Sequence, residues 1–154
     1  MNQLSLLLSA ALTVIAAVHF LWAAGGVWPC SDEQNLARTV VGTRGIDQMP
    51  ARWTSAAIGA VLLFAALWAL FLRQVLPISP PRLVILIGGM ALAYIFVLRG
   101  VLGILPSFER VAPEQPFVRL NRLVYSPLSL IIGAAFMLLV IAWPNWTWRL
   151  GLIF

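Results

Sequence analysis

The chain has 154 residues, of which 62% are hydrophobic and only 10% are charged, and its formal net charge is +5. This composition excludes an ordinary soluble domain and predicts an integral membrane protein. All ten basic residues are arginines, scattered over loops and helix ends rather than gathered on one basic surface, so we expect no nucleic-acid partner.

Four apolar stretches are long enough to cross a bilayer, because a spanning helix needs roughly 20 apolar residues. They cover residues 4–24, 53–72, 83–105 and 127–148. Since they use more than half of the chain, we expect one transmembrane domain over residues 1–154. The predicted fold is an all-α four-helix membrane bundle with two long connections on one face.

The first span ends at Gly25-Gly26, and glycine commonly terminates helices. In the polar connection that follows, Ser31 with Gln34 has capping-box spacing, which predicts a short helix over residues 32–41. The second span is rich in small residues, and several of them are four positions apart. Such spacing lets neighbouring helices approach closely, and we expect it to serve packing inside the bundle.

A short proline-rich link joins the second and third spans, and Arg99 lies near the end of the third. In the next connection, Pro116 can open a helix whose apolar stripe predicts an amphipathic segment lying in the membrane interface. Tyr125-Ser126-Pro127 then begins the fourth span. At its far end, an aromatic belt is predicted from Trp143, Trp146 and Trp148 with Arg149.

This layout brings both long connections, the His19 end of the first span and the Arg99 end of the third to one membrane face. We expect a bacterial inner (cytoplasmic) membrane with both termini inside. The arginine count opposes that orientation, because Arg38, Arg44, Arg52, Arg110, Arg119 and Arg122 lie in the long connections. We expect these arginines to have structural roles, whereas Arg73, Arg82, Arg149 and the amino terminus are uncompensated on the other side.

His19, the only histidine, marks the candidate site, because ionisable groups at membrane depth usually face a cavity or a partner. On a helix it shares a face with Trp22 and Gly26. The expected site lies at the loop-bearing face and includes the turn at residues 44–47. The predicted ligand-binding residues are His19, Trp22, Arg99, Asn121, Arg122 and Tyr125, with His19 as the candidate acid or base.

Each member also has a purely structural interpretation. His19 can bond to a backbone carbonyl or a loop acid, and Arg99 can snorkel or pair with Glu109, Glu114 or Asp47. Trp22 and Tyr125 can be interfacial anchors. We expect His19 and Arg99 to line the same pocket and Tyr125 to close it. We expect the Arg99 guanidinium to meet an acid or several carbonyls.

The residues available exclude several membrane chemistries. With one cysteine and one histidine, the chain has no Cys-x-x-Cys pair, no bis-histidine haem site and few zinc ligands. No metal and no cofactor are therefore expected. The spans lack Asp and Glu, which disfavours a proton-coupled transporter.

The chain resembles a widespread bacterial family of small four-span membrane proteins, classed as a domain of unknown function. The resemblance rests on His19-x-x-Trp22-x-x-Gly25-Gly26, Leu98-Arg99-Gly100, Phe117…Leu120-Asn121 and Tyr125-Ser126-Pro127-Leu128. It implies the architecture and the motif positions, but no activity. In that family an acid often stands where this chain has Asn121.

The sequence favours binding of a small amphipathic or anionic ligand, such as a lipid headgroup or a quinone-like molecule, in a one-sided polar pocket. Chemical modification of that ligand stays open, and so does enzyme activity. The alternative is a non-catalytic accessory or assembly subunit of a larger membrane complex. Expected partners are membrane lipid, an amphipathic small molecule and, in the alternative, another membrane protein.

Overall fold

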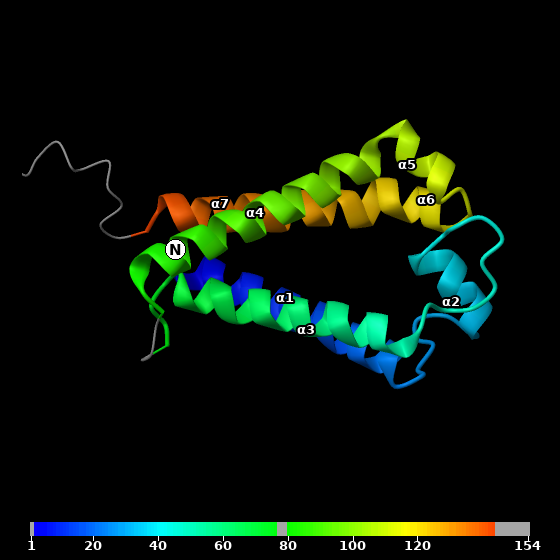
Figure 1. Ribbon diagram of the computed structural model, residues 1–154, viewed down its shortest axis with the longest axis horizontal. Coiled ribbons are helices and arrows are strands. Elements are labelled where there is room, and N and C mark those ends of the chain that lie inside the picture. The colour runs from blue at the N-terminus through cyan, green and yellow to red at the C-terminus, as the bar shows by residue number, and fades with distance from the viewer. Residues whose placement is uncertain (1, 77–79, 144–154) are drawn as a thin grey trace, which may run out of the picture.

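The computed structural model describes residues 2–76 and 80–143, which form helices and connecting loops (Figure 1). Three predicted spans are continuous α-helices: α1 (Asn2–Ala23), α3 (Arg52–Phe71) and α4 (Arg82–Ile104). The fourth, Phe117–Ile141, is equally long and apolar enough to cross a membrane. The predicted all-α bundle with four membrane spans is therefore confirmed.

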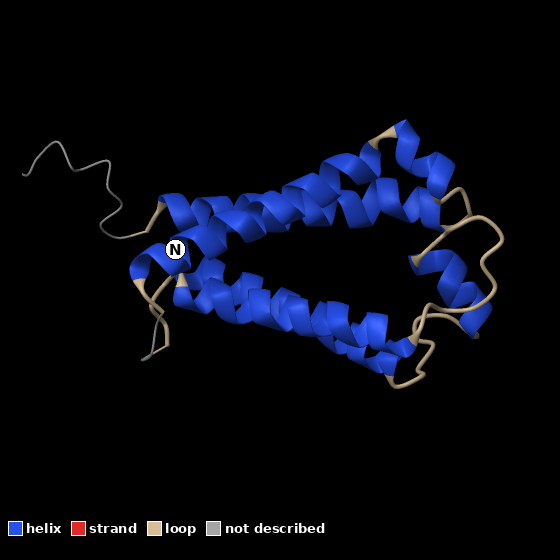
Figure 2. Ribbon diagram, in the orientation of Figure 1, coloured by secondary structure: helices blue, strands red, loops and turns tan. Residues whose placement is uncertain are grey.

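The four spans are arranged as two antiparallel pairs. Helix α1 packs along α3, and α4 packs along α7 (Ser126–Ile141), whereas contacts between the two pairs are fewer. The pairs meet at one end and diverge toward the end that carries α2 (Glu33–Val40), as Figure 2 shows. The two pairs are therefore farthest apart at the loop-bearing end.

Glycine lets the helices within each pair approach closely. A Cβ on Gly59 would lie 3.3 Å from the carbonyl oxygen of Ala16 in α1, and one on Gly133 would lie 2.9 Å from the backbone nitrogen of Val97 in α4. The small residues of α3 are largely buried against their neighbours. Their predicted role in internal packing therefore agrees with the structure.

Apolar packing closes the end at which the pairs meet. Leu12, Leu72, Ile85 and Phe136 are almost fully buried there, in one continuous core. The Trp68 indole nitrogen also donates to the carbonyl oxygen of Ile85 at 3.0 Å, linking α3 to α4. We call this the closed end because apolar side chains fill it. A site between the helix pairs is therefore expected at the opposite end.

The short helix α2 forms where it was expected, but its cap is Asp32 rather than Ser31. The Asp32 carboxylate accepts from the backbone nitrogen of Asn35 at 2.8 Å, and the Ser31 hydroxyl donates to the same carboxylate at 2.8 Å. The Asn35 N–H, with help from Ser31, holds the pKa of Asp32 below its ordinary value. The expected Ser31–Gln34 box is wrong because Asp32 is itself a strong cap and starts the helix one residue later.

The helix predicted after Pro116 forms, but it is continuous with the fourth span and is not a separate interfacial segment. Helix α6 (Phe117–Leu120) continues through the π-helix η1 (Asn121–Tyr125) into α7, so all three belong to the fourth span. In the π turn, the backbone nitrogen of Ser126 donates to the carbonyl oxygen of Asn121. Pro127 removes a single N–H donor, and the wider turn lets the helix pass it without a break.

The second long connection contains α5 (Pro106–Val111), a helix that the sequence analysis did not predict, with proline in its first turn. The predicted aromatic belt is only partly testable, since Trp146, Trp148 and Arg149 lie outside the described residues. Trp143 is 6% exposed and belongs to the core of the closed end. It is therefore a packing residue rather than an interfacial anchor.

Candidate functional site

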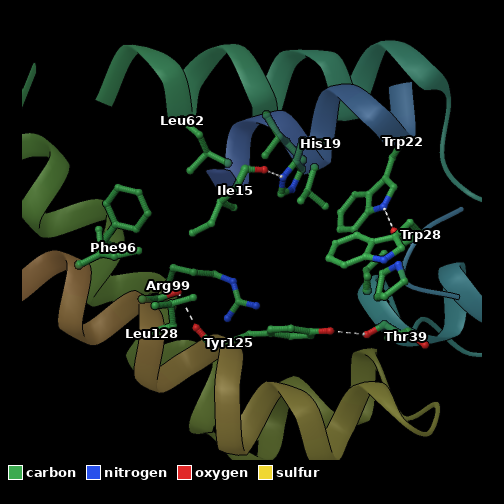
Figure 3. Close-up of a pocket in the computed structure, with 16 residues that line it drawn as sticks. Ile15, His19, Trp22, Trp28, Thr39, Leu62, Phe96, Arg99, Tyr125 and Leu128 are labelled. Atoms are coloured by element: carbon green, nitrogen blue, oxygen red, sulfur yellow. Dashed lines mark hydrogen bonds between the residues drawn. The ribbon is translucent and has the colours of Figure 1, made fainter. Parts of the chain in front are cut away.

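A cavity of about 510 Å³ lies between the two helix pairs at the loop-bearing end (Figure 3). All four spans contribute to its walls, and the loop at Trp28-Pro29 and the end of α2 cover it. Most lining side chains are apolar or aromatic. The polar ones are His19, Thr39, Arg99, Tyr125 and Ser129.

His19 lines this cavity from α1 and is half-buried. Its Nδ1 lies 2.9 Å from the carbonyl oxygen of Ile15, one turn earlier on the same helix. Because a carbonyl can only accept, Nδ1 carries the proton, which makes Nε2 of the neutral ring an acceptor. The predicted bond to a backbone carbonyl thus exists together with a position on the cavity wall.

Trp22 and Tyr125 line the cavity and also hold its cover in place. The Trp22 indole nitrogen donates to the carbonyl oxygen of Trp28 at 2.7 Å, and the Tyr125 hydroxyl donates to that of Thr39 at 3.1 Å. Figure 3 shows both bonds on the loop side of the cavity. These side chains fasten the covering loop and α2 to the spans, and their aromatic faces remain as cavity wall.

Arg99 lines the cavity from α4 and meets a single amide oxygen instead of the expected acid or several carbonyls. Its Nη2 donates to Oδ1 of Asn121 at 2.9 Å, and its Cζ lies 5.4 Å from the ring centroid of Phe108. Nη1 is buried without a hydrogen-bond partner among the described residues. The difference arises because the π turn carries Asn121 against α4, while Glu109 and Glu114 of the second connection have other partners.

Asn121 does not line the cavity, but it is 1% exposed and organises this corner of the bundle. Its Nδ2 donates to the carbonyl oxygen of Gly103 at 2.6 Å, and its Oδ1 also accepts from the Ser126 hydroxyl at 3.3 Å. One amide therefore ties α4 to the fourth span and fixes the Arg99 side chain. The sequence carries no local signal for this role.

Two other predicted members lie away from the cavity. Arg122 pairs with Glu109 of α5 and is not part of the lining. The turn at residues 44–47 is also absent from the lining, because the backbone nitrogen of Gly45 donates to Glu114 at 2.9 Å and holds the turn against the second connection. The expected convergence is therefore limited to His19, Trp22, Arg99 and Tyr125, and their ligand-binding role stays a prediction.

Trp28 and Phe96 are aromatic lining residues that the sequence analysis missed. Trp28 lies in a loop, where no periodicity indicates its direction, and it is 63% exposed although one face lines the cavity. Phe96 is three residues before Arg99, and that helical spacing would have placed it on the same face.

Four apolar spans around a cavity near the loop-bearing end define a small multi-pass helical membrane protein. Within that class, residues 12–136 match the family model described as "Protein of unknown function (DUF3995)", and the chain belongs to this family. The matched segment contains every residue that lines the cavity. Comparisons with curated proteins and with solved structures gave no match.

Proposed function

We propose that this protein binds a small amphipathic molecule, such as a lipid headgroup or a quinone-like compound, in the cavity between its two helix pairs. The cavity itself carries the proposal. Its volume, about 510 Å³, lies within the range of roughly 300–1,000 Å³ that small-molecule sites occupy. Apolar walls with a few polar groups are typical of such sites.

The polar groups suit the head of such a molecule. His19 offers an acceptor at Nε2, since Nδ1 is bonded to Ile15. Arg99 offers donors, since only Nη2 is bonded within the described residues. Trp22, Trp28 and Phe96 supply aromatic surface for an apolar body.

The rim of the cavity supports entry from the bilayer. Ile58 of α3 and Leu128 of α7 line the cavity and are 49% and 38% exposed, within membrane-spanning segments. A ligand dissolved in the membrane would meet these side chains first. The alternative of an accessory subunit receives less support, because the small-residue stripe of α3 is occupied by packing inside the chain.

We also propose the bacterial inner membrane as the location, with both termini on the cytoplasmic side. The support is the arginine pair Arg73 and Arg82 beside the short link. Among the described arginines of the long connections, Arg122 pairs with Glu109. That pairing is the kind of structural role we expect for these arginines.

Extraction of the protein with its surrounding lipid into polymer-bounded discs tests the binding function. Bound molecules are identified by mass spectrometry in the native chain and in Val18→Trp, which fills the cavity from α1. Val14→Trp is the matched control, because Val14 lies one turn earlier, is 64% exposed and does not line the cavity. We expect one small molecule to be enriched in the native chain and the control and depleted in Val18→Trp. Equal content in all three would contradict the proposal.

A further inference from the structure

Arg99 is a cation within a membrane-spanning helix, and it has no acidic partner among the described residues. All five acidic side chains lie among the described residues. Four of them have partners elsewhere: Asp32 caps α2, Glu33 accepts from Met49, Glu109 pairs with Arg122, and Glu114 accepts from Gly45. Asp47 is exposed in the turn at residues 44–47, away from the cavity.

The neighbours of Arg99 hold its guanidinium in place without neutralising it. Its Nη2 donates to Oδ1 of Asn121, and its Cζ lies over the aromatic ring of Phe108. A guanidinium has five N–H donors, and the described residues accept from one of its nitrogens, Nη2. No acidic side chain therefore neutralises the charge of Arg99, which lines an apolar cavity where a cation is costly unless it is paired.

We propose that the molecule bound in the cavity is an anionic amphiphile whose carboxylate or phosphate-monoester head pairs with Arg99. This inference rests on the proposed binding function and names the chemical class of its ligand. Arginine matches both oxyanions with paired N–H donors. Asn121 acts as a positioning residue, because its bonds to Gly103 and Ser126 fix the oxygen that orients Nη2.

Equilibrium dialysis with phosphatidylcholine nanodiscs tests the class of the head group at constant chain length. The probes are dodecanoate, dodecyl phosphate, dodecanol and dodecyltrimethylammonium, with a decyl-substituted benzoquinone as the neutral carbonyl and inorganic phosphate as the head alone. Binding is the excess over empty discs. We expect both anionic amphiphiles to bind at least tenfold more tightly than dodecanol, a difference of about 1.4 kcal/mol, and inorganic phosphate to show no measurable binding.

Two substitutions assign this preference to Arg99. Arg99→Gln removes the charge, and Asn121→Asp places a carboxylate where Oδ1 now accepts from Nη2. Each should reduce the anion preference to less than threefold while dodecanol binding changes less than twofold. Arg82→Gln is the matched control, since Arg82 is exposed at the opposite end of the same helix, and it should keep the tenfold preference.

The outcomes separate this inference from the function on which it rests. If the native chain binds dodecanol or the benzoquinone as tightly as the anions, the cavity binds a neutral amphiphile and the anionic class is wrong. If no probe binds beyond empty discs, the binding function itself is wrong. If Arg99→Gln does not fold, Arg99→Lys replaces it. Because lysine keeps the charge, Arg99→Lys should keep the preference for anionic amphiphiles, and loss of that preference would contradict the assignment to Arg99. The probe series with the native chain then tests the anionic class by itself.

Discussion

Asn121 is the residue on which the polar end of the bundle depends. It is buried and bonds to Arg99, Gly103 and Ser126, in two different spans. An amide can serve donors and acceptors together, so no apolar residue of similar size can replace it. The family that the sequence resembles often has an acid at this position, whereas in this chain the Asn121 amide donates to the Gly103 carbonyl, a bond that an ionised carboxylate could not make.

The first prediction follows from this network. Asn121→Ala should lower the free energy of unfolding by about 1–3 kcal/mol, because buried polar groups on both spans lose their partner. Reversible unfolding in mild detergent measures the change. Arg119→Ala, an exposed neighbour on α6, should stay within about 0.5 kcal/mol of the native chain. Equal effects of the two substitutions would mean that the network adds no stability.

His19 yields a second prediction, because its structural bond stays within one helix. Its Nδ1 bonds to Ile15, whose carbonyl also lies in the regular α1 ladder, so the fold depends little on it. His19→Phe should change the free energy of unfolding by less than about 1 kcal/mol. It should also reduce the content of co-extracted ligand several-fold, since the Nε2 acceptor is lost, whereas His19→Gln keeps an acceptor and should retain more. A strongly destabilised His19→Phe with unchanged ligand content would make His19 structural.

At the scale of elements, the cover of the cavity depends on α2. Its amino-terminal cap is the exposed Asp32 carboxylate, whose pKa is lowered by the Asn35 N–H. A lowered pKa in the folded state means that the cap stabilises α2 above the ordinary pKa of 3.8. That contribution is lost as the pH falls through the lower folded value.

We therefore expect the hydrogen-exchange protection of the α2 amides to fall as the pH drops below the ordinary pKa of 3.8 and through the lower pKa of the folded state. Protection is expressed as protection factors, which correct for the intrinsic exchange rate. Asp32→Asn keeps a capping oxygen but cannot titrate, so it should remove the pH dependence. Persistence of the same pH dependence in Asp32→Asn would show that another group is responsible.

The sequence predicted the first three spans to within one or two residues of their ends, because an uninterrupted apolar run of membrane length has few other structures open to it. It failed where one residue decides the outcome. The choice of Asp32 over Ser31 as cap, and the π turn before Pro127, depend on local hydrogen bonds that no periodicity encodes.

The same contrast holds for the site. The sequence could predict that four of the lining residues share one cavity, because the alternating direction of the spans brings the span ends that carry them to one membrane face. These residues are His19, Trp22, Arg99 and Tyr125. The partner of Arg99 could not be predicted, since it depends on how far α5 and the fourth span are rotated toward α4. Trp28 was missed because its direction is set by a hydrogen bond from the Trp22 indole nitrogen to the backbone carbonyl oxygen of Trp28.

At the scale of the whole molecule, orientation in the membrane can be measured with single cysteines. Cys30 is half-buried and contacts Thr39, so a Cys30→Ser background is preferable. In that background, Gln48→Cys places an exposed thiol in the first long connection, and Val75→Cys places one at the closed end. Both termini inside predicts that an impermeant thiol reagent labels Gln48→Cys in intact cells and Val75→Cys only after lysis. The reverse pattern would show that the arginine count sets the orientation.

Photo-crosslinking tests the central claim, ligand binding between the helix pairs, most directly. Protein in phosphatidylcholine discs is irradiated with dodecanoic acid that carries a diazirine on its chain, and the modified residues are identified by mass spectrometry. We predict modification concentrated on the cavity walls, at residues such as Ile58, Phe96 and Ile132, and lost in Val18→Trp. Labelling spread over the lipid-facing residues Val14, Val61 and Ile131, and unchanged in Val18→Trp, would contradict it.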